Sequence, residues 1–358
     1  MINKRMKIAA LVSGGVDSSV ALKMVKDLGH DVTAFYLKIW LEDELASLGS
    51  CPWQEDLEYV RATCDQLGVP LKVISFQREY QERIVTYTIS EIKKGRTPNP
   101  DVLCNQRIKF GAFFQAIDNT FDKVVSGHYA HIVYRDGIPF LQQAPDKIKD
   151  QTYFLASLNR EQLERAWFPI GQMTKKEVRA YARAAKLPAM DRKDSQGICF
   201  LGKLRFKDFV AHHVGTKTGD LIEFESGTKL GEHKGFWFYT IGQRRGSGLS
   251  GGPWYVVRKD PETNTVYVSC KYYEQDKVRN SFEIDDMVWV NGKAPLEGQL
   301  LQVKMRHGSE AHQCTVSVGA NNVTYITLQD RDQGIAPGQF AVLYQDGLCL
   351  GLGAISRE

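Results

Sequence analysis

Apolar residues in the first half of the chain occur in short runs that alternate with amphipathic stretches. The run 8–12 (IAALV) predicts a buried strand, and residues 20–28 carry apolar positions at helical spacing before Gly29. The same alternation predicts further strands at 31–40, 69–76 and 123–127, and helices at 54–67, 80–94, 108–117 and 174–185. Strands that alternate with helices indicate an α/β fold, a doubly wound parallel sheet with helices on both faces. Ligands of such sheets bind at the carboxyl ends of the strands.

The pattern changes near residue 215, where glycines and short alternating segments replace the helical periodicity. Strands are expected at 220–224, 236–241, 254–258, 265–269, 287–290, 300–305, 313–318, 323–328 and 341–344. Regularly spaced strands with turn residues between them predict one small β-rich unit and one β-barrel. We therefore expect three domains: an α/β domain at 1–205, a central β-rich domain at 206–275 and a C-terminal barrel at 276–358.

The segment SGGVDSS, residues 13–19, joins the first predicted strand to the first predicted helix. Its glycines allow the backbone to approach an anion, and the helix N-terminus offers free N–H groups to phosphate. The Walker pattern is absent, because no GKS or GKT tripeptide occurs in the chain. Asp17 is the carboxylate of this turn, and a carboxylate beside phosphate is favourable when it holds a cation such as Mg²⁺. The alternative interpretation is an ordinary glycine-rich turn.

Composition narrows the class of protein. The chain has 358 residues, of which 43% are apolar and 25% charged, as expected of a globular protein with two or three domains. No apolar run approaches the length of a membrane span, so we expect no membrane association. Seven cysteines without a CxxC pair favour free thiols in a cytoplasmic protein over a disulfide framework or a zinc site. The net charge of +4 permits a nucleic-acid partner without requiring one.

Two cysteines lie in segments of unusual composition. In residues 95–105 (GRTPNPDVLCN), two prolines predict an extended, rigid segment that carries Asp101 and Cys104. The alternative is a rigid connector with a buried cysteine, although the neighbouring polar residues weaken it. Residues 191–202 (DRKDSQGICFLG) predict a flexible polar loop, which favours an accessible thiol at Cys199.

Other features have open interpretations. His128 follows the strand expected at 123–127, and a histidine there is more often structural than functional. The basic turn 242–246 (GQRRG) could grip phosphates or be only a tight turn. The cysteines in or beside the C-terminal strands are most simply core residues; they are Cys270, Cys314 and Cys349.

Several motifs follow one another along nearly the whole chain. They are SGGVDSSV (13–20), GRTPNPDVLCN (95–105), IKFGAF (108–113), SGHYA (126–130), KDQTYFL (149–155), DSQGICFLG (194–202), YTIGQRRG (239–246), PWYVV (253–257) and PGQFAVLY (337–344). In these motifs and their order the sequence resembles the tRNA-specific 2-thiouridylases of the PP-loop ATP pyrophosphatase superfamily. The departures are mild: Leu37 and Gln196 stand where methionine and threonine are frequent, and the turn before Pro253 is short.

The resemblance implies an ATP-dependent tRNA-uridine 2-sulfurtransferase with ATP and Mg²⁺ as cofactors. Such an enzyme adenylates the C2 oxygen of the wobble uridine, transfers sulfur from a cysteine persulfide, and yields 2-thiouridine, AMP and pyrophosphate. Cys199 matches the persulfide cysteine, Cys104 its partner in sulfur release and disulfide formation, and Asp101 an acid/base beside the target base. The implied partners are tRNA and a persulfide donor, either a cysteine desulfurase or a sulfur-relay protein.

The resemblance also implies binding positions. Contacts to ATP are expected at Leu11, Val12, Ser13, Gly14, Gly15, Val16, Asp17, Ser18, Leu37 and Gly127, with Asp17 on the metal. Contacts to tRNA are expected at Asn99, Pro100, Asp101, His128, Lys149, Asp150, Gln151, Arg306, His307 and Gln339. Since Cys104 follows two prolines and Cys199 follows a glycine, we expect a fixed Cys104 and a movable Cys199. Without tRNA their Cα atoms should lie beyond the roughly 7 Å limit for a disulfide.

Two other functions remain open at this point. An amidating PP-loop synthetase would need an ammonia source, and no second catalytic motif is visible in the chain. A nucleotide-binding RNA adaptor with inert cysteines would need no chemistry at all. Thiouridine analysis of tRNA after incubation with ATP distinguishes the three functions.

Overall fold

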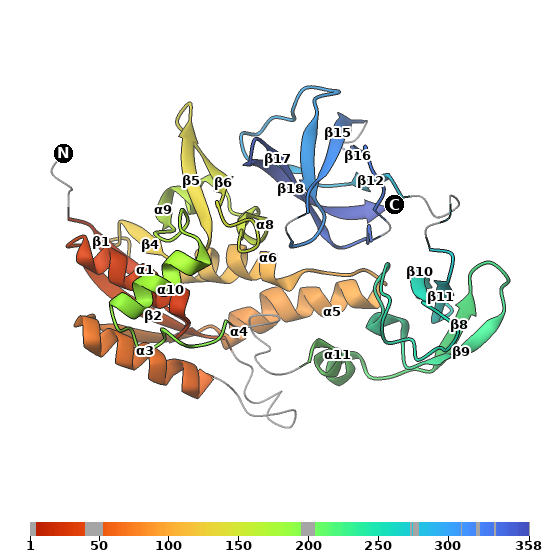
Figure 1. Ribbon diagram of the computed structural model, residues 1–358, viewed down its shortest axis with the longest axis horizontal. Helices are drawn as coiled ribbons and strands as arrows, with labels where there is room; N and C mark the ends of the chain where they lie inside the picture. Colours follow the sequence, from red (N-terminus) through yellow and green to blue (C-terminus); the bar gives the residue numbers. More distant parts are fainter. Residues whose placement is uncertain are drawn as a thin grey trace.

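The computed structural model describes residues 5–39, 53–194, 205–272, 274, 279–308, 310–319, 323–332 and 334–357. These residues form an α/β unit, a small β unit and a β-barrel (Figure 1). The barrel and the small β unit lie on the same side of the α/β unit, and the segment containing α11 leads into the small β unit. No helix among these residues is long and apolar enough to cross a membrane.

The α/β unit is built on a five-stranded parallel sheet with strand order β3-β2-β1-β4-β7. The strands are β1 (Lys7–Leu11), β2 (Asp31–Lys38), β3 (Leu71–Ser75), β4 (Lys123–Val125) and β7 (Ala166–Trp167). Along β1, Ile8 and Ala10 belong to one hydrophobic cluster while Ala9 and Leu11 belong to another. Alternate residues of a strand face opposite sides of a sheet, so both faces of this sheet are covered. The predicted doubly wound parallel sheet is confirmed.

The helices of this unit include the five predicted ones, with some bounds shifted, together with others that the sequence pattern did not predict. The helices are α1 (Val16–Asp27), α3 (Trp53–Leu67), α4 (Gln77–Tyr80), η2 (Gln81–Val85), α5 (Thr86–Lys93), α6 (Pro100–Cys104), η3 (Asn105–Ala112), α7 (Phe113–Ala116), α8 (Thr152–Leu155), α9 (Arg160–Arg165), α10 (Lys175–Ala184) and α11 (Phe206–Val214). A capping box formed by Thr174 and Glu177 begins α10. The prediction of an extended segment through Cys104 was wrong, because a helix begins at Pro100. Proline fits the first turn of a helix, where its missing N–H is not needed.

The small β unit contains four strands in the order β10-β11-β8-β9. They are β8 (Gly219–Glu223), β9 (Lys229–His233), β10 (Tyr255–Asp260) and β11 (Thr265–Ser269). The strand predicted at 236–241 was wrong: Phe236–Phe238 form a short 3-10 helix, η4. The rings of Phe236, Trp237 and Phe238 all contact one hydrophobic cluster, which the alternation of a strand would prevent.

The C-terminal barrel is closed by pairing of its first and last strands, β12 and β18. Its strands are β12 (Ser281–Ile284), β13 (Val288–Trp289), β14 (Leu301–Lys304), β15 (His312–Val318), β16 (Thr324–Leu328), β17 (Phe340–Gln345) and β18 (Leu348–Arg357). Cys314 and Cys349 are buried in or beside these strands, as predicted. Cys270 is exposed, which corrects its assignment to the core, because β11 ends one residue earlier.

A hairpin of the α/β unit extends the sheet of the barrel. This hairpin turns at Asp136 and Gly137 and consists of β5 (Ala130–Arg135) and β6 (Ile138–Gln143). Strand β6 pairs with β18, and Gln143 N donates to the carbonyl of Gly347 at 2.8 Å. One hydrophobic cluster contains residues of both units, including Leu141 and Tyr344. The barrel is therefore attached to the α/β unit by strand pairing and by a shared core. The exact domain boundaries at 205 and 275 stay predictions.

Candidate functional site

The phosphate loop, residues 12–18, connects β1 to α1 and leaves the N-terminus of α1 open. Gly15 is the N-cap residue with an extended backbone (φ −81°, ψ 160°), and no side chain caps the helix. The hydroxyls of Ser18 and Ser19 instead donate to the carbonyl of Gly15 at 3.1 and 3.0 Å. The first N–H groups of α1 are thus available to an anion, and the helix dipole favours negative charge at this point.

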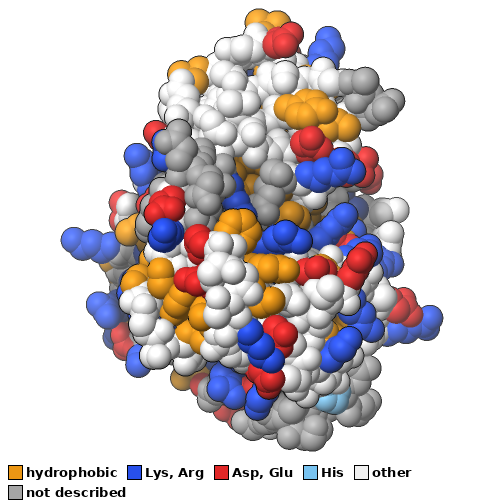
Figure 2. Space-filling view, turned by 90° about the vertical axis from the view of Figure 1, so that its right-hand side faces the viewer, with side chains coloured by type: hydrophobic (Ala, Val, Ile, Leu, Met, Phe, Trp, Pro, Cys, Tyr) orange, Lys and Arg blue, Asp and Glu red, His pale blue; other side chains and the backbone are white. Residues whose placement is uncertain are grey.

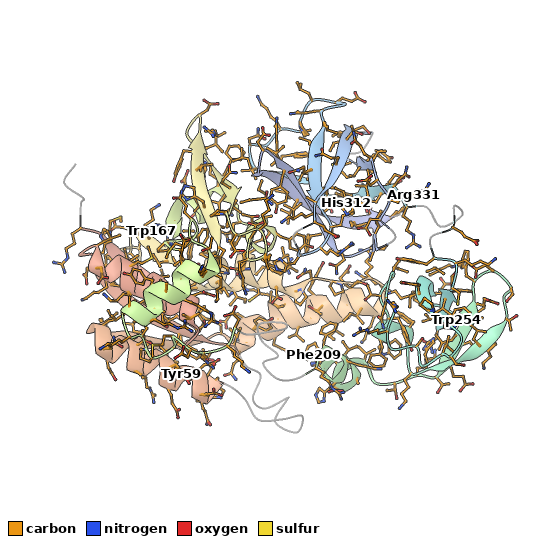
Figure 3. All side chains as sticks on the ribbon, in the orientation of Figure 1. Tyr59, Trp167, Phe209, Trp254, His312 and Arg331 are labelled. Carbon is orange, nitrogen blue, oxygen red and sulfur yellow. The ribbon has the colours of Figure 1, made fainter. Side chains whose placement is uncertain are left out.

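The backbone of the loop requires glycine at Gly14. Its φ of +77° lies in the left-handed region, and a Cβ atom there would come within 2.8 Å of Arg192 Nη1. Arg192 donates to the carbonyl of Gly14 at 3.0 Å and forms an ion pair with Asp56 of α3. The guanidinium also covers the ring of Tyr59, 4.6 Å from its centroid; Tyr59 is labelled on α3 in Figure 3. Arg192 therefore holds the phosphate loop against α3.

Gly127 lies directly against the start of α1. A Cβ atom at this position would lie 2.6 Å from the backbone carbon of Asp17 and 2.6 Å from the nitrogen of Ser18. Backbone atoms cannot yield as a flexible side chain can, so only glycine allows β4 to end this close to the phosphate loop. The sequence assigned Gly127 and the loop to one ATP site, and the structure brings them into contact.

We expect Gly127→Ala to weaken ATP binding roughly 5- to 150-fold, because overpacking strain is typically about 1–3 kcal/mol. Isothermal titration calorimetry with ATP measures the effect. Gly231→Ala is the control, since this glycine of β9 has no left-handed backbone and a Cβ atom there meets only the end of the Leu249 side chain, at 3.4 Å. Unchanged ATP affinity in a folded Gly127→Ala protein would contradict the role of this close contact.

Asp17 is held by two partners in the first turn of α1. Tyr129 donates its hydroxyl to Asp17 Oδ1 at 2.7 Å, and Lys175 Nζ lies 2.8 Å from both carboxylate oxygens. Lys175 is the first residue of α10, so this helix brings a positive charge to the phosphate loop. Mg²⁺ is usually held by one or two carboxylates together with substrate phosphates, and the carboxylate of Asp17 is of the kind that would fit such a site. Among the described residues no cluster of three metal-ligating side chains occurs.

The helix α6 carries the second predicted set of residues. Asp101 and Cys104 lie three residues apart, so they face the same side of α6. Cys104 is only 1% exposed, and its burial raises the pKa of the thiol to about 11. The charge of Lys109 lowers this pKa, and the charge of Asp101 raises it, so both charges act on the thiol. Cys104 is thus a buried cysteine, the alternative that its polar neighbours in the sequence had weakened.

His128 lies next to the aromatic core rather than in a cationic site. Its Nδ1 is within 2.8 Å of Ser126 Oγ, and its ring lies 5.9 Å from that of Phe168. Burial, together with the charge of Lys109, lowers the pKa of His128 well below its usual value. The imidazole is therefore neutral at physiological pH and can contribute to a substrate contact as a hydrogen-bonding group only.

Residues 146–151, here called the bridging loop, belong to the α/β unit and contact the barrel through an ion pair. Asp150 is 1% exposed, and its carboxylate accepts hydrogen bonds from Thr152 Oγ1 at 2.9 Å and Lys304 Nζ at 3.1 Å. Lys304 belongs to β14 and is equally buried. The predicted tRNA contact of the Asp150 side chain does not fit this burial, and its role here is to anchor the loop. Gln151 also serves the fold, because its side chain accepts from Tyr129 N at 3.0 Å.

We expect Asp150→Asn to lower the free energy of unfolding by about 3–5 kcal/mol, because the ammonium of Lys304 is left buried without a counter-ion. Combining it with Lys304→Met should restore much of this loss, since the second change removes the unpaired charge. Denaturant unfolding of the two single variants and the double variant measures the coupling. Additive losses in the double variant would contradict a buried ion pair at this contact.

The barrel places two predicted tRNA residues, His307 and Gln339, against the α/β unit. Gln339 Nε2 donates to the carbonyl of Thr97 at 2.7 Å, beside the segment that leads into α6. The ring of His307 lies 4.5 Å from that of Phe154. Burial and the charge of Lys304 lower the pKa of His307, so its imidazole is neutral at physiological pH.

Arg306 opens onto a cleft between the barrel and the small β unit. Its guanidinium forms an ion pair with Asp332 at 2.8 Å, and Asp332 also pairs with His312, labelled in Figure 3. The cleft has a volume of about 590 Å³ and includes the stacked rings of Tyr255 and Tyr272. Its lining extends to Gln339, so the cleft is continuous with the predicted tRNA contacts.

Leu37 lies near the end of β2, at the carboxyl edge of the sheet where the phosphate loop lies. Leu11, Val12 and Val16 are buried supports of that loop, and Ser13 is exposed. Asn99 has an extended backbone and is the N-cap residue of α6. Cys199, with the rest of 195–204, lies outside the described residues, so its predicted accessibility and its separation from Cys104 are not tested.

Comparison with known proteins places the chain in a family. Family models match it over residues 6–203 (tRNA methyl transferase HUP domain), 207–270 (tRNA methyl transferase PRC-barrel domain) and 279–355 (aminomethyltransferase beta-barrel domain). The tRNA-specific 2-thiouridylase MnmA of Parabacteroides distasonis is 44% identical over 359 residues, which cover 99% of each chain. This chain belongs to the tRNA-specific 2-thiouridylase family. The Porphyromonas gingivalis 2-thiouridylase is 42% identical over 361 residues, covering 98% of this chain and 99% of the relative.

Comparison with solved structures gives only a weak alignment for this 2-thiouridylase family member. The U34-tRNA thiolase NcsA from Methanococcus maripaludis aligns with a TM-score of 0.35 at 16% identity, over 57% of this chain and 63% of the other. Membership of the 2-thiouridylase family confirms the resemblance seen in the sequence, and it implies an enzyme that uses ATP.

Sequence reasoning missed the polar residues that support the predicted site. Tyr129, Lys175 and Arg192 contact the phosphate loop from three different segments. One signal was available for Lys175, which stands at the first position of a helix, where the dipole disfavours a cation unless an anion faces it. The contact between Arg192 and Gly14 spans 178 residues and has no local signal.

Proposed function

We propose that this enzyme 2-thiolates a uridine of tRNA, activating the C2 oxygen with ATP and then replacing it with sulfur from a cysteine persulfide. One observation carries the proposal: the open N-terminus of α1, with Asp17 and Lys175, belongs to the same sheet unit as the α6 helix with Asp101 and Cys104. The barrel contacts the segment that leads into α6, through the hydrogen bond from Gln339 to the carbonyl of Thr97. One molecule thus combines a phosphate site with a thiol and a carboxylate, beside the residues predicted to contact tRNA.

In the activation step the protein binds the triphosphate and orients its α-phosphate. The N–H groups at the start of α1 bind phosphate oxygens, while Lys175 neutralises the charge that develops on the leaving pyrophosphate. Leu37 and the buried residues Leu11 and Val12 form the side of the site suited to adenine. Mg²⁺, held by Asp17 and the phosphates, would supply charge neutralisation and orientation of the leaving group.

The target base is assigned to the N-terminal end of α6. Asn99 and Pro100 bound this position, and Asp101 is placed to accept or return a proton at the base. The neutral His128 and the aromatic surroundings of His307 suit a flat, uncharged ring. Adenylation turns the C2 oxygen into part of AMP, which is a good leaving group.

Sulfur transfer uses the two cysteines of the matched motifs. The terminal sulfur of a Cys199 persulfide attacks C2 and AMP leaves; Cys104 then attacks the Cys199 sulfur, which releases 2-thiouridine and leaves a Cys104–Cys199 disulfide. An external thiol must reduce that disulfide before the next cycle. Because the thiolate is the nucleophile, the raised pKa of Cys104 keeps this residue inactive in the ligand-free enzyme.

The tRNA surface combines Lys149, Gln151, Arg306, His307 and Gln339, with Asp150 as internal support. Figure 2 shows Lys and Arg side chains across the middle of one face, interspersed with Asp and Glu. Such a mixed surface favours recognition of shape by a limited number of phosphate contacts. The persulfide donor is a protein of the desulfurase or sulfur-relay class, and the predicted cytoplasmic location stays a prediction.

The proposal is tested with purified protein, ATP, Mg²⁺, an unmodified tRNA transcript and a persulfide source. Mass spectrometry of the digested tRNA should show 2-thiouridine, with AMP and pyrophosphate formed in equal amounts. An amidated nucleoside would instead indicate the synthetase alternative. Binding of ATP and tRNA without any change in the tRNA would support the adaptor.

A further inference from the structure

A cluster of ion pairs joins the phosphate loop to the bridging loop. Lys175 Nζ lies 2.8 Å from Asp17 and also 2.7 Å from Asp194 Oδ1. The other oxygen of Asp194, Oδ2, lies 2.6 Å from Lys149 Nζ. Arg179 Nη2 completes the cluster at 2.8 Å from Oδ1. The two oxygens of one carboxylate therefore bind a lysine of the ATP site and a lysine of the predicted tRNA surface.

The cluster continues into the barrel through the bridging loop. Lys149 is followed by Asp150, whose buried carboxylate binds Lys304 of β14. Arg306, a predicted contact to tRNA, follows Lys304 by two residues in the chain. At the other end of the bridging loop, Asp146 Oδ2 accepts a hydrogen bond from the backbone nitrogen of Lys175 at 3.0 Å. Side chains that are assigned to the two substrates are thus linked by consecutive short contacts.

The charges of the cluster are partly withdrawn from water. The side chains of Asp194 and Lys175 are 27% and 13% exposed, so salt screens their attraction less than that of a surface pair. Burial alone would raise the pKa of Asp194, but hydrogen bonds from Lys149 and Lys175 bring it down to about 2. The carboxylate is therefore ionised at neutral pH. The cations around it compete for its negative charge. When one of two cations leaves a shared carboxylate, the other is held more strongly because the repulsion between them ends.

We propose that Asp194 is a positioning residue that couples the binding of tRNA to the binding of ATP by exchanging its lysine partners. The inference rests on the proposed function, which assigns Lys149 to tRNA and Asp17 to ATP. A tRNA phosphate that binds Lys149 leaves Asp194 with a stronger hold on Lys175. Lys175 then shifts from Asp17 toward Asp194, and the Asp17 carboxylate becomes available to the cation that accompanies ATP. By linkage, ATP raises the affinity for tRNA by the same factor.

The test measures the dissociation constant of a nonhydrolysable ATP analogue with Mg²⁺ by calorimetry, with and without unmodified tRNA. In the wild-type protein tRNA should tighten analogue binding by on the order of tenfold, within the usual range for coupled sites. In Asp194→Asn, which keeps the size of the side chain, the ratio of the two constants should fall to about one. Lys149→Ala should bind the analogue, in the absence of tRNA, as tightly as the wild-type protein does with tRNA.

Asp191→Asn is the matched control, because Asp191 lies in the same segment and forms an exposed ion pair with Arg183 at 3.4 Å. Its ratio should equal that of the wild-type protein. A wild-type ratio of one, an unchanged ratio in Asp194→Asn, or an unchanged affinity in Lys149→Ala would overturn the inference. If Asp194→Asn fails to fold, the Lys149→Ala measurement decides. Failure of the wild-type protein to bind tRNA or the analogue contradicts the proposed function instead.

Discussion

Replacing Asp17 with asparagine should reduce the formation of AMP and pyrophosphate by on the order of 10³-fold or more. The structure gives Asp17 a position that no other described carboxylate shares, in the first turn of α1 and in contact with both Tyr129 and Lys175. Asparagine keeps the hydrogen bond from Tyr129 but removes the charge that binds a cation beside the phosphates. The measurement is the rate of AMP release from radiolabelled ATP with tRNA present.

The fold should survive this substitution, because Lys175 retains its ion pair with Asp194. Asp27→Asn is the control on the same helix, where Asp27 forms an ion pair with Lys23 near the C-terminal end of α1. The control should keep nearly full activity. Near-normal AMP release by a folded Asp17→Asn protein would refute the assignment of Asp17.

Replacing the two motif cysteines should abolish thiolation at different steps. Cys199→Ser should lose both the persulfide label and all 2-thiouridine formation. Cys104→Ser should keep the label on Cys199 but lose turnover, because the bond between the persulfide sulfurs is no longer broken. Persulfide-specific labelling followed by peptide mapping, together with thiouridine analysis, separates the two results.

Cys270→Ser provides the control, since Cys270 is an exposed thiol of the small β unit outside the motifs. It should leave labelling and turnover unchanged. Labelling that appears on Cys104 and survives the loss of Cys199 would reverse the two roles. The burial of Cys104 makes that reversal a demanding result, because a sulfur donor must reach the thiol that is to be loaded.

The fold followed from the sequence wherever side-chain periodicity was regular. Strands β1, β2 and β11 and the helix α10 were predicted within one or two residues because apolar spacing, caps and glycines agreed. The errors at Pro100 and at Phe236–Phe238 have a common cause. In both places a local signal, proline in one and an apolar run in the other, is compatible with two backbone conformations, and packing against distant residues selects between them.

The site was predictable only in part for a similar reason. The phosphate loop is a local motif whose geometry follows from one strand, one turn and one helix. Its supports are not local: Arg192 reaches Gly14 across 178 residues, and Lys175 reaches Asp17 across 158. The burial of Asp150 also depends on a distant partner, Lys304. The polar sequence around Asp150 therefore did not indicate that its side chain is buried.

The attachment of the barrel to hairpin β5–β6 has a consequence for synthesis of the chain on the ribosome. The hydroxyl of Tyr153 donates to the carbonyl of Phe340, 187 residues later, and the apolar side chains around Tyr153 are covered by β17 and β18. At about 5–20 residues per second, the ribosome needs roughly 10–40 s to make the intervening chain. During that interval the α/β unit exposes an apolar surface at its hairpin. A nascent-chain chaperone should therefore bind this surface, and release should coincide with the emergence of the last strand.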